Sequence, residues 1–236
     1  CNCWRAAITH LETKGREAIK WLKLDLTPPF LDHMSFRIGN QLFFVQIEDI
    51  DNGLDTPSNI AGLKLIARDC NGVACKMPMR RKGIGWETCS PDWGLIKLDT
   101  KELINPYNIV TDENIPMTDW EIQDFAVQVV RNYVEDELKF KISSSQGNPA
   151  VNPSIWFNGK EKHECIIVGS AKFGDYLPEL PTDVMDIIKS FSDVTDVVHF
   201  ASVCFYHPEQ KNFEDVLPLY RGHGMGIKFS GLKLIA

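Results

Sequence analysis

A glycine-rich segment near the end of the sequence carries residues suited to holding an anion. It reads Tyr-Arg-Gly-His-Gly-Met-Gly over residues 220–226. Glycines at alternate positions let a backbone approach an anion closely, and Arg221 and His223 could bind a phosphate or a carboxylate. The segment is not a P-loop, because the Gly-Lys-Ser/Thr end and the following helix are absent. The alternative, which we favour, is a glycine-rich turn that leads into a last strand.

The cysteines and histidines indicate neither a disulfide framework nor a familiar metal motif. Seven cysteines are an odd number, which favours a reducing compartment, and the six histidines show no HExxH spacing. Cys1 and Cys3, together with Cys70 and Cys75, could form a four-thiolate zinc site. However, the second pair flanks an Asn-Gly dipeptide, and a hairpin turn there explains its proximity without a metal. We therefore expect no cofactor from these residues.

Composition and charge exclude several classes of protein. Hydrophobic residues make up 44% and charged residues 24%, as in an ordinary globular protein. No apolar stretch approaches the roughly 18 residues of a membrane helix, and no signal peptide is recognisable, so a cytoplasmic location without membrane contact is expected. Residues 111–236 carry 11 Lys+Arg against 19 Asp+Glu. This excess disfavours nucleic-acid binding by that half, and the basic run at residues 80–82 is typical of a solvated loop.

The first half of the chain, residues 1–110, predicts one helix on an antiparallel sheet. Apolar spacing predicts a helix over residues 4–22. A Gly-Asn dipeptide predicts a hairpin between strands 33–38 and 41–48. Further strands are expected at residues 60–67, 73–77 and 93–98.

The second half, residues 111–236, predicts the element order α-β-β-β-α-β followed by an extra strand. Thr118 and Glu121 form a capping box that opens a helix to about residue 138. An Asn-Gly dipeptide at residues 158 and 159 predicts a hairpin between strands 154–157 and 163–170, with Ile155 and Trp156 on opposite faces. The remaining expected elements are a strand at 140–143, a helix at 181–191, and strands at 197–206 and 226–235.

These elements together predict an α+β fold, with two helix-on-antiparallel-sheet halves packed into one compact body. The hexapeptide Gly-Leu-Lys-Leu-Ile-Ala occurs at residues 62–67 and again at residues 231–236. It could mark a duplication of the two halves, or it could be two similar amphipathic strands.

The element order of residues 119–206 resembles the core of the restriction-endonuclease-like, or PD-(D/E)XK, superfamily. In that superfamily two carboxylates hold Mg²⁺ while a lysine helps to orient the attacking water. The resemblance implies catalytic positions at Glu121, Asn152 and Glu164, with Glu121 and Glu164 as metal ligands. Asn152 is neutral where an Asp is expected, and Ile166 stands where the lysine is expected. Lys162 or Lys172 could supply the missing lysine from elsewhere.

Structural explanations compete at the same positions. Glu121 is accounted for by the capping box, and Glu164 by the exposed face of a strand. On the capping-box explanation, Thr118→Ala should cost more stability than Glu121→Ala.

Two functions follow from these observations. The favoured one is a non-catalytic intracellular binding or regulatory protein of the bacterial type, which contacts a protein partner or itself. The alternative is a metal-dependent nuclease of the restriction-endonuclease-like type, active or decayed, and only this alternative requires Mg²⁺.

Overall fold

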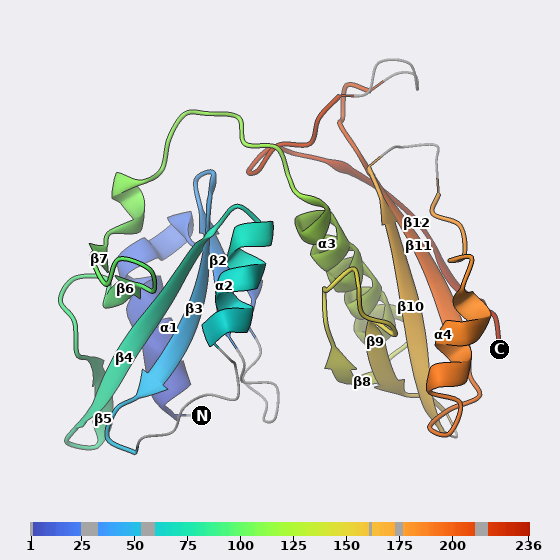
Figure 1. Cartoon of the computed structure of the whole chain (residues 1–236), viewed down its shortest axis with the longest axis horizontal. Coiled ribbons are helices and arrows are strands. Elements are labelled where there is room, and N and C mark those ends of the chain that lie inside the picture. Colours follow the sequence, from blue (N-terminus) through green and yellow to red (C-terminus); the bar gives the residue numbers. More distant parts are fainter. Residues whose placement is uncertain (1, 25–32, 53–59, 161, 173–176, 211–216) are drawn as a thin grey trace. The chain divides into compact units, whose positions relative to one another are not determined.

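The chain divides into two compact units, Cys1–Ile115 and Pro116–Ala236, and each is described by itself (Figure 1). This computed structural model describes all residues except 1, 25–32, 53–59, 161, 173–176 and 211–216. The boundary lies five residues later than the sequence suggested. The side chain of Asn40 explains the shift, because it donates to Thr111 Oγ1 at 2.9 Å and to the Glu113 carbonyl at 2.8 Å. No helix in the described ranges is long and apolar enough to cross a membrane.

The first unit is a mixed sheet with a helix on each side. Its elements in chain order are α1 (Asn2–Gly15), a 3-10 turn (Arg16–Ala18), β1 (Lys20–Lys23), β2 (Met34–Ile38), β3 (Gln41–Asp49), α2 (Ile60–Asp69), β4 (Val73–Lys82), β5 (Gly85–Thr88), β6 (Leu95–Lys97), β7 (Leu103–Ile104) and a second 3-10 turn (Pro106–Asn108). The strand order is β1-β2-β3-β4-β6-β7, and β5 pairs with β4. The expected hairpin of β2 and β3 is confirmed. The expectation of a purely antiparallel sheet is wrong, because β3 and β4 run parallel.

Two local predictions in this unit are also wrong. Residues 60–67 form most of helix α2 rather than a strand, and Leu63 and Ala67, four residues apart, are its buried positions. The first helix ends at Gly15, and strand β1 follows where the helix was expected to continue. Trp21 pairs with Phe36 across β1 and β2, so tertiary pairing takes these residues out of the helix.

The second unit is likewise a mixed sheet with a helix on each side. Its elements are α3 (Asp119–Asn132), a π-helical turn (Tyr133–Glu137), β8 (Lys141–Ser145), β9 (Ile155–Asn158), β10 (His163–Ala171), α4 (Val184–Ser190), β11 (Val198–Tyr206) and β12 (Gly226–Leu234). The strand order is β12-β11-β10-β9-β8. The α-β-β-β-α-β order with an extra strand is confirmed, and so is the hairpin of β9 and β10. The sheet is again mixed, because β10 and β11 are parallel.

Alternation along the central strands places one apolar layer on each face of this sheet. Ile155, Ile166 and Val168 pack with α3 on one face. Cys165 and Ile167 pack with α4 on the other face, where Trp156 also lies. Ile155 and Trp156 therefore occupy opposite faces, as the alternation predicted.

The two units share one arrangement of elements. Each has a helix, three successive antiparallel strands, a second helix, a fourth strand parallel to the third and an antiparallel strand beside the fourth. The repeated hexapeptide does not follow this correspondence. Its first copy lies in α2 and its second in and after β12. The likeness of the halves therefore lies in topology and not in this repeat.

Candidate functional site

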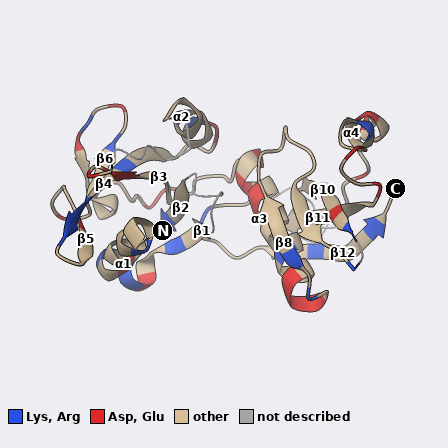
Figure 2. Cartoon of the chain, turned by 90° about the horizontal axis from the view of Figure 1, so that it is seen from below, with Lys and Arg blue, Asp and Glu red and all other residues tan. Residues whose placement is uncertain are grey.

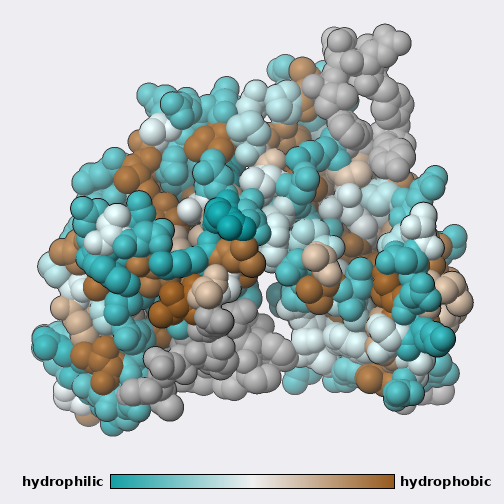
Figure 3. Space-filling view, viewed as in Figure 1, coloured by the Kyte–Doolittle hydropathy of each residue, from teal (hydrophilic) through white to brown (hydrophobic). Residues whose placement is uncertain are grey.

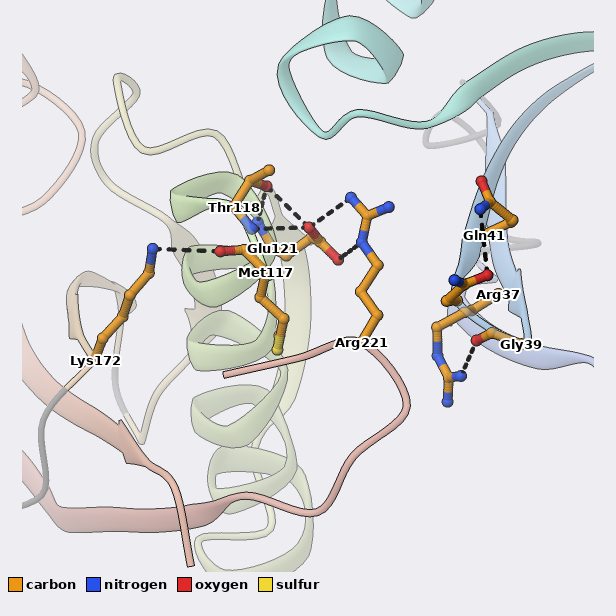
Figure 4. A network of polar contacts seen from close by, with 9 residues as sticks. Arg37, Gly39, Gln41, Met117, Thr118, Glu121, Lys172 and Arg221 are labelled. Atoms are coloured by element: carbon orange, nitrogen blue, oxygen red, sulfur yellow. Dashed lines mark hydrogen bonds and ion pairs between the residues drawn. The ribbon is translucent and has the colours of Figure 1, made fainter. Parts of the chain in front are cut away.

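The capping box at the start of α3 is present as the sequence predicted. Thr118 is the N-cap residue, and its hydroxyl oxygen accepts from the Glu121 backbone N–H at 3.3 Å. The Glu121 carboxylate accepts in return from the Thr118 backbone N–H at 2.9 Å and from the Thr118 hydroxyl at 3.1 Å. The side chain of Glu121 thus points back at the start of its own helix (Figure 4).

Glu121 has a second partner that the sequence did not reveal. The guanidinium of Arg221 donates to it twice, from Nε at 2.8 Å and from the Nη2 nitrogen at 2.9 Å. The exposed fractions of the two side chains are 1% for Arg221 and 5% for Glu121. A buried two-point pair of this kind is strongly directional, because the planar guanidinium matches the carboxylate. The pair fixes the segment around Arg221 to the start of α3.

The start of α3 lies beside the end of β10. Gln123 Nε2 donates to the Val168 carbonyl at 2.9 Å. Lys172 Nζ donates to the Met117 carbonyl at 3.3 Å (Figure 4). The same nitrogen lies 2.6 Å from an Asp119 oxygen. Lys172 is therefore held by the cap region of α3.

Glu164 occupies the opposite end of β10 and pairs with His199. His199 Nε2 lies 2.7 Å from Glu164 Oε2, and each side chain is 16% exposed. A Cβ atom added at Gly159 would fall 1.9 Å from Glu164 Oε1, so a larger residue there would have to displace the carboxylate or the turn. Glu164 was a candidate from the sequence, whereas no sequence pattern pointed to His199, because the proximity of the two residues depends on the pairing of β10 with β11. A carboxylate that orients an imidazole in this way can support proton transfer.

Asn152 lies away from Glu164 along the sheet. Glu164 pairs with Phe157 on β9, whereas the Ser154 N–H donates to Ile166. Three residues of strand, roughly 10 Å, separate Phe157 from Ser154, and Asn152 precedes Ser154 by two residues. Glu164 also precedes Val168, beside the start of α3, by four residues, which is roughly 13 Å of strand. The structure thus separates Glu164 from both Asn152 and the start of α3, so the three candidate residues do not form one site.

The same placement decides how these residues fit a divalent cation. Glu121 is engaged by Arg221, and Glu164 lies at the other end of β10. Lys162, the other candidate lysine, pairs with Asp196. Over the residues that the structure describes, no group of three or more His, Cys, Asp and Glu side chains is placed to hold a metal ion. The arrangement therefore does not fit the Mg²⁺ site that the superfamily resemblance implies.

Arg221 and His223 were candidates for a shared anion site, but the structure gives them different surroundings. Arg221 is buried against Glu121. His223 is exposed, and its ring lies 5.6 Å from that of Tyr220. The His223 N–H donates to the Tyr220 carbonyl, three residues earlier, which is the backbone hydrogen bond of a β-turn.

Cys3, Cys75 and Cys165 are free thiols that are buried in the fold. Burial raises the pKa of Cys75 to about 12 and that of Cys165 to about 12. Burial, together with the charge of Asp49, raises the pKa of Cys3 to about 11. These thiols therefore behave as small apolar groups. The zinc alternative cannot be followed at Cys1, which lies outside the described residues.

The fold and site define an α+β protein of two topologically alike units. A family model described as a domain of unknown function, DUF8840, matches residues 120–235, which is the second unit almost from end to end. Comparison with curated proteins and comparison with solved structures gave no match.

Proposed function

We propose that this chain is a non-catalytic binding or regulatory protein that acts through protein–protein contacts. The observation that carries the proposal is the apolar outer margin of β12. This strand ends the second sheet, and its outer edge pairs with no other described strand. Ile227 and Leu234 are 48% and 62% exposed on it. An unpaired strand with exposed apolar side chains is a template for a strand or an apolar surface of another protein.

The side chains of β12 are arranged for such a contact. Ile227 pairs with Phe205 and Leu234 pairs with His199, so both lie on the sheet face that carries α3. Between them Phe229 and Leu232 are partly buried against the same layer. Lys228 and Lys233 point to the other face, where they favour a partner with acidic residues. Figure 3 shows that apolar residues on the face in view occur in small groups among polar ones, which is typical of a modest contact.

The surroundings of the acidic residues support a role without catalysis. Glu121 is engaged by the capping box and by Arg221, so its carboxylate is already used in the fold where the nuclease alternative requires a metal ligand. Free thiols at Cys3, Cys75, Cys89 and Cys165 fit a reducing compartment, and we place the protein in the cytoplasm.

Sedimentation velocity over a range of protein concentrations tests contact with a second copy through β12. We expect association that weakens with dilution and is lost in the double variant Ile227→Lys, Leu234→Lys, because lysines on an edge strand block pairing. The matched control is Leu103→Lys with Met185→Lys, which changes residues of similar exposure on β7 and α4. A wild-type chain that stays monomeric excludes self-association. Loss of association in the control but not in the β12 variant excludes this edge.

The alternative function, a metal-dependent nuclease, is supported by the element order of the second unit. That order matches the one on which the superfamily resemblance rests. Its test is cleavage of DNA and RNA by purified protein in Mg²⁺ or Mn²⁺, with Glu164→Ala as the variant and Asn152→Asp as the restoration. We expect cleavage by neither the wild type nor Asn152→Asp. Metal-dependent cleavage that Glu164→Ala abolishes would overturn the non-catalytic proposal.

A further inference from the structure

The hairpin of β4 and β5 carries an exposed apolar tip. Lys82 pairs with Gly85, so Gly83 and Ile84 form a two-residue turn. Gly83 has φ +58°, a value that favours glycine, and a Cβ built there meets no described atom within 4 Å. Ile84 is fully exposed, at 110% of its reference surface. The tip therefore stands clear of the described part of its unit.

Three successive cations precede this tip and alternate between the two faces of the ribbon. Arg80, Arg81 and Lys82 are all exposed. Because successive side chains of a strand point to opposite faces, Arg80 and Lys82 share one face and Arg81 occupies the other. Figure 2 shows this end of the first unit in the colour of basic residues.

Neighbouring side chains on β5 orient these cations. Glu87 pairs with Arg80 at 3.0 Å and also with Lys82. The hydrogen bond from Lys82 and the one from Arg80 lower the pKa of the Glu87 carboxyl. The guanidinium of Arg81 lies 5.4 Å from the centre of the Trp86 ring. The cations therefore extend from the flanks of the ribbon and not from its tip.

The charge of the hairpin remains positive after its acidic neighbours are included. Residues 79–88 contain three cations and one carboxylate. Asp51 lies beside the hairpin close to its turn, where its carboxylate accepts from the Arg81 backbone N–H, and with Asp51 included three cations still face two carboxylates. The second half of the chain is acidic, so it offers little attraction for phosphates.

We propose that the β4–β5 hairpin enters a groove of double-stranded DNA, with Arg80, Arg81 and Lys82 on phosphates and Ile84 against base edges. The major groove is wide enough for a two-stranded β-ribbon, and phosphate backbones border it on both sides. Cations on both faces of the ribbon match that geometry. Arginine suits it further, because its planar fork binds phosphate at two points. The apolar tip can contact thymine methyl groups at the floor of the groove.

An anionic lipid surface is the competing partner, and the same residues disfavour it. A lipid surface would meet the tip end-on, and a single isoleucine offers it little apolar area. The cations, held along the flanks by Glu87 and Trp86, would lie beside the membrane contact and not within it. A DNA groove, by contrast, has a floor of base edges and two borders of phosphates, so it can contact both the apolar tip and the cations on the flanks of the ribbon.

Fluorescence anisotropy with a labelled DNA duplex and the full-length chain tests this inference. Three phosphate contacts predict a slope of about −2.7 for the logarithm of affinity against the logarithm of salt, or roughly a 40-fold loss between about 50 and about 200 mM salt. The triple variant Arg80→Gln, Arg81→Gln, Lys82→Gln should lose binding together with this salt dependence. The matched control makes the same charge change at the exposed Lys20, Lys141 and Lys189 and should bind as the wild type does.

The variant Ile84→Ser and a binding assay with lipid vesicles distinguish DNA binding from binding to an anionic membrane. Ile84→Ser alters only a fully exposed side chain, and it should weaken duplex binding while leaving the salt slope in place. Binding that the triple variant retains, or that Ile84→Ser leaves unchanged, would overturn the proposal. So would the absence of duplex binding by the wild type at low salt, or binding to phosphatidylserine vesicles in place of DNA. A thermal melt of each variant shows that it is folded.

Discussion

Arg221 and Glu121 form a buried two-point ion pair across 100 residues of sequence, with N–O distances of 2.8 and 2.9 Å. The pair uses the carboxylate that the superfamily resemblance would assign to a metal. It also removes Arg221 from the exposed glycine-rich turn in which the sequence suggested an anion site. One contact thus changes the interpretation of two candidate sites.

Removing the cation of this pair should strongly destabilise the second unit. Arg221→Ala leaves the Glu121 carboxylate buried without its partner, which costs about 3–5 kcal/mol of unfolding free energy. Urea denaturation followed by circular dichroism measures this difference. Lys189→Ala, at an exposed position on α4, is the control and should change stability by less than about 0.5 kcal/mol. A loss below about 1 kcal/mol for Arg221→Ala would show that the pair contributes little.

Substitutions in the two halves of the capping box should cost different amounts of stability, in the order opposite to that expected from the sequence. Thr118→Ala removes one cap and should cost about 1 kcal/mol. Glu121→Ala removes the reciprocal bond and also leaves Arg221 buried without its carboxylate, so its cost should approach about 3–5 kcal/mol. Denaturant titrations of the two variants side by side measure the order. A smaller loss for Glu121→Ala than for Thr118→Ala would contradict the buried pair.

Gly159→Ala should disturb the pair of Glu164 and His199. The added methyl group would fall 1.9 Å from Glu164 Oε1, so the carboxylate must move away from His199 or the turn must shift. We expect lower stability and a changed His199 imidazole resonance in NMR spectra. The matched control is Gly62→Ala in α2, where a Cβ meets no described atom within 4 Å and alanine is the better helix former by about 0.5–1 kcal/mol. If Gly159→Ala left the His199 resonance unchanged, Glu164 would not depend on the glycine.

The cysteines should differ clearly in their rates of alkylation. At a pH near the ordinary thiol pKa of 9.0, burial keeps Cys75 and Cys165 protonated, because their pKa values rise to about 12. Cys89 is exposed and should be alkylated first, although partial burial raises its pKa as well. Mass spectrometry of peptides after timed alkylation measures the rates. Equal rates at Cys75 and Cys89 would contradict the buried setting of β4.

The same thiols predict how stability depends on alkaline pH. Their pKa values are higher in the folded chain than in the unfolded chain, so the unfolded chain loses these protons first. The contribution of Cys75 and Cys165 to stability is therefore complete below pH 9.0 and is lost as the pH rises toward about 12. The denaturant midpoint of the wild type should therefore fall as the pH is raised across that range. In Cys75→Ala the midpoint starts lower, but its fall over the same range should be smaller, because one of the two thiols is absent.

The sequence by itself determined the elements whose cause is local. The capping box at Thr118 and Glu121 is specified within four residues, because the bonds that close it run between those residues alone. The hairpins at Gly39 and at Asn158 follow from turn dipeptides between alternating strands. The α-β-β-β-α-β order of the second unit follows from such local signals in succession.

Tertiary structure decided what depends on partners distant in sequence. The hexapeptide Gly-Leu-Lys-Leu-Ile-Ala is helical in α2, whereas its second copy begins within strand β12. Its own propensities are the same in both places, so the neighbouring strands decide which backbone pairing satisfies its N–H and C=O groups. The parallel pairing of β10 with β11 brings His199 to Glu164, and the chain's return after β11 brings Arg221 to Glu121. No local pattern encodes these pairs, because each forms only when strands or segments far apart in the chain are packed side by side.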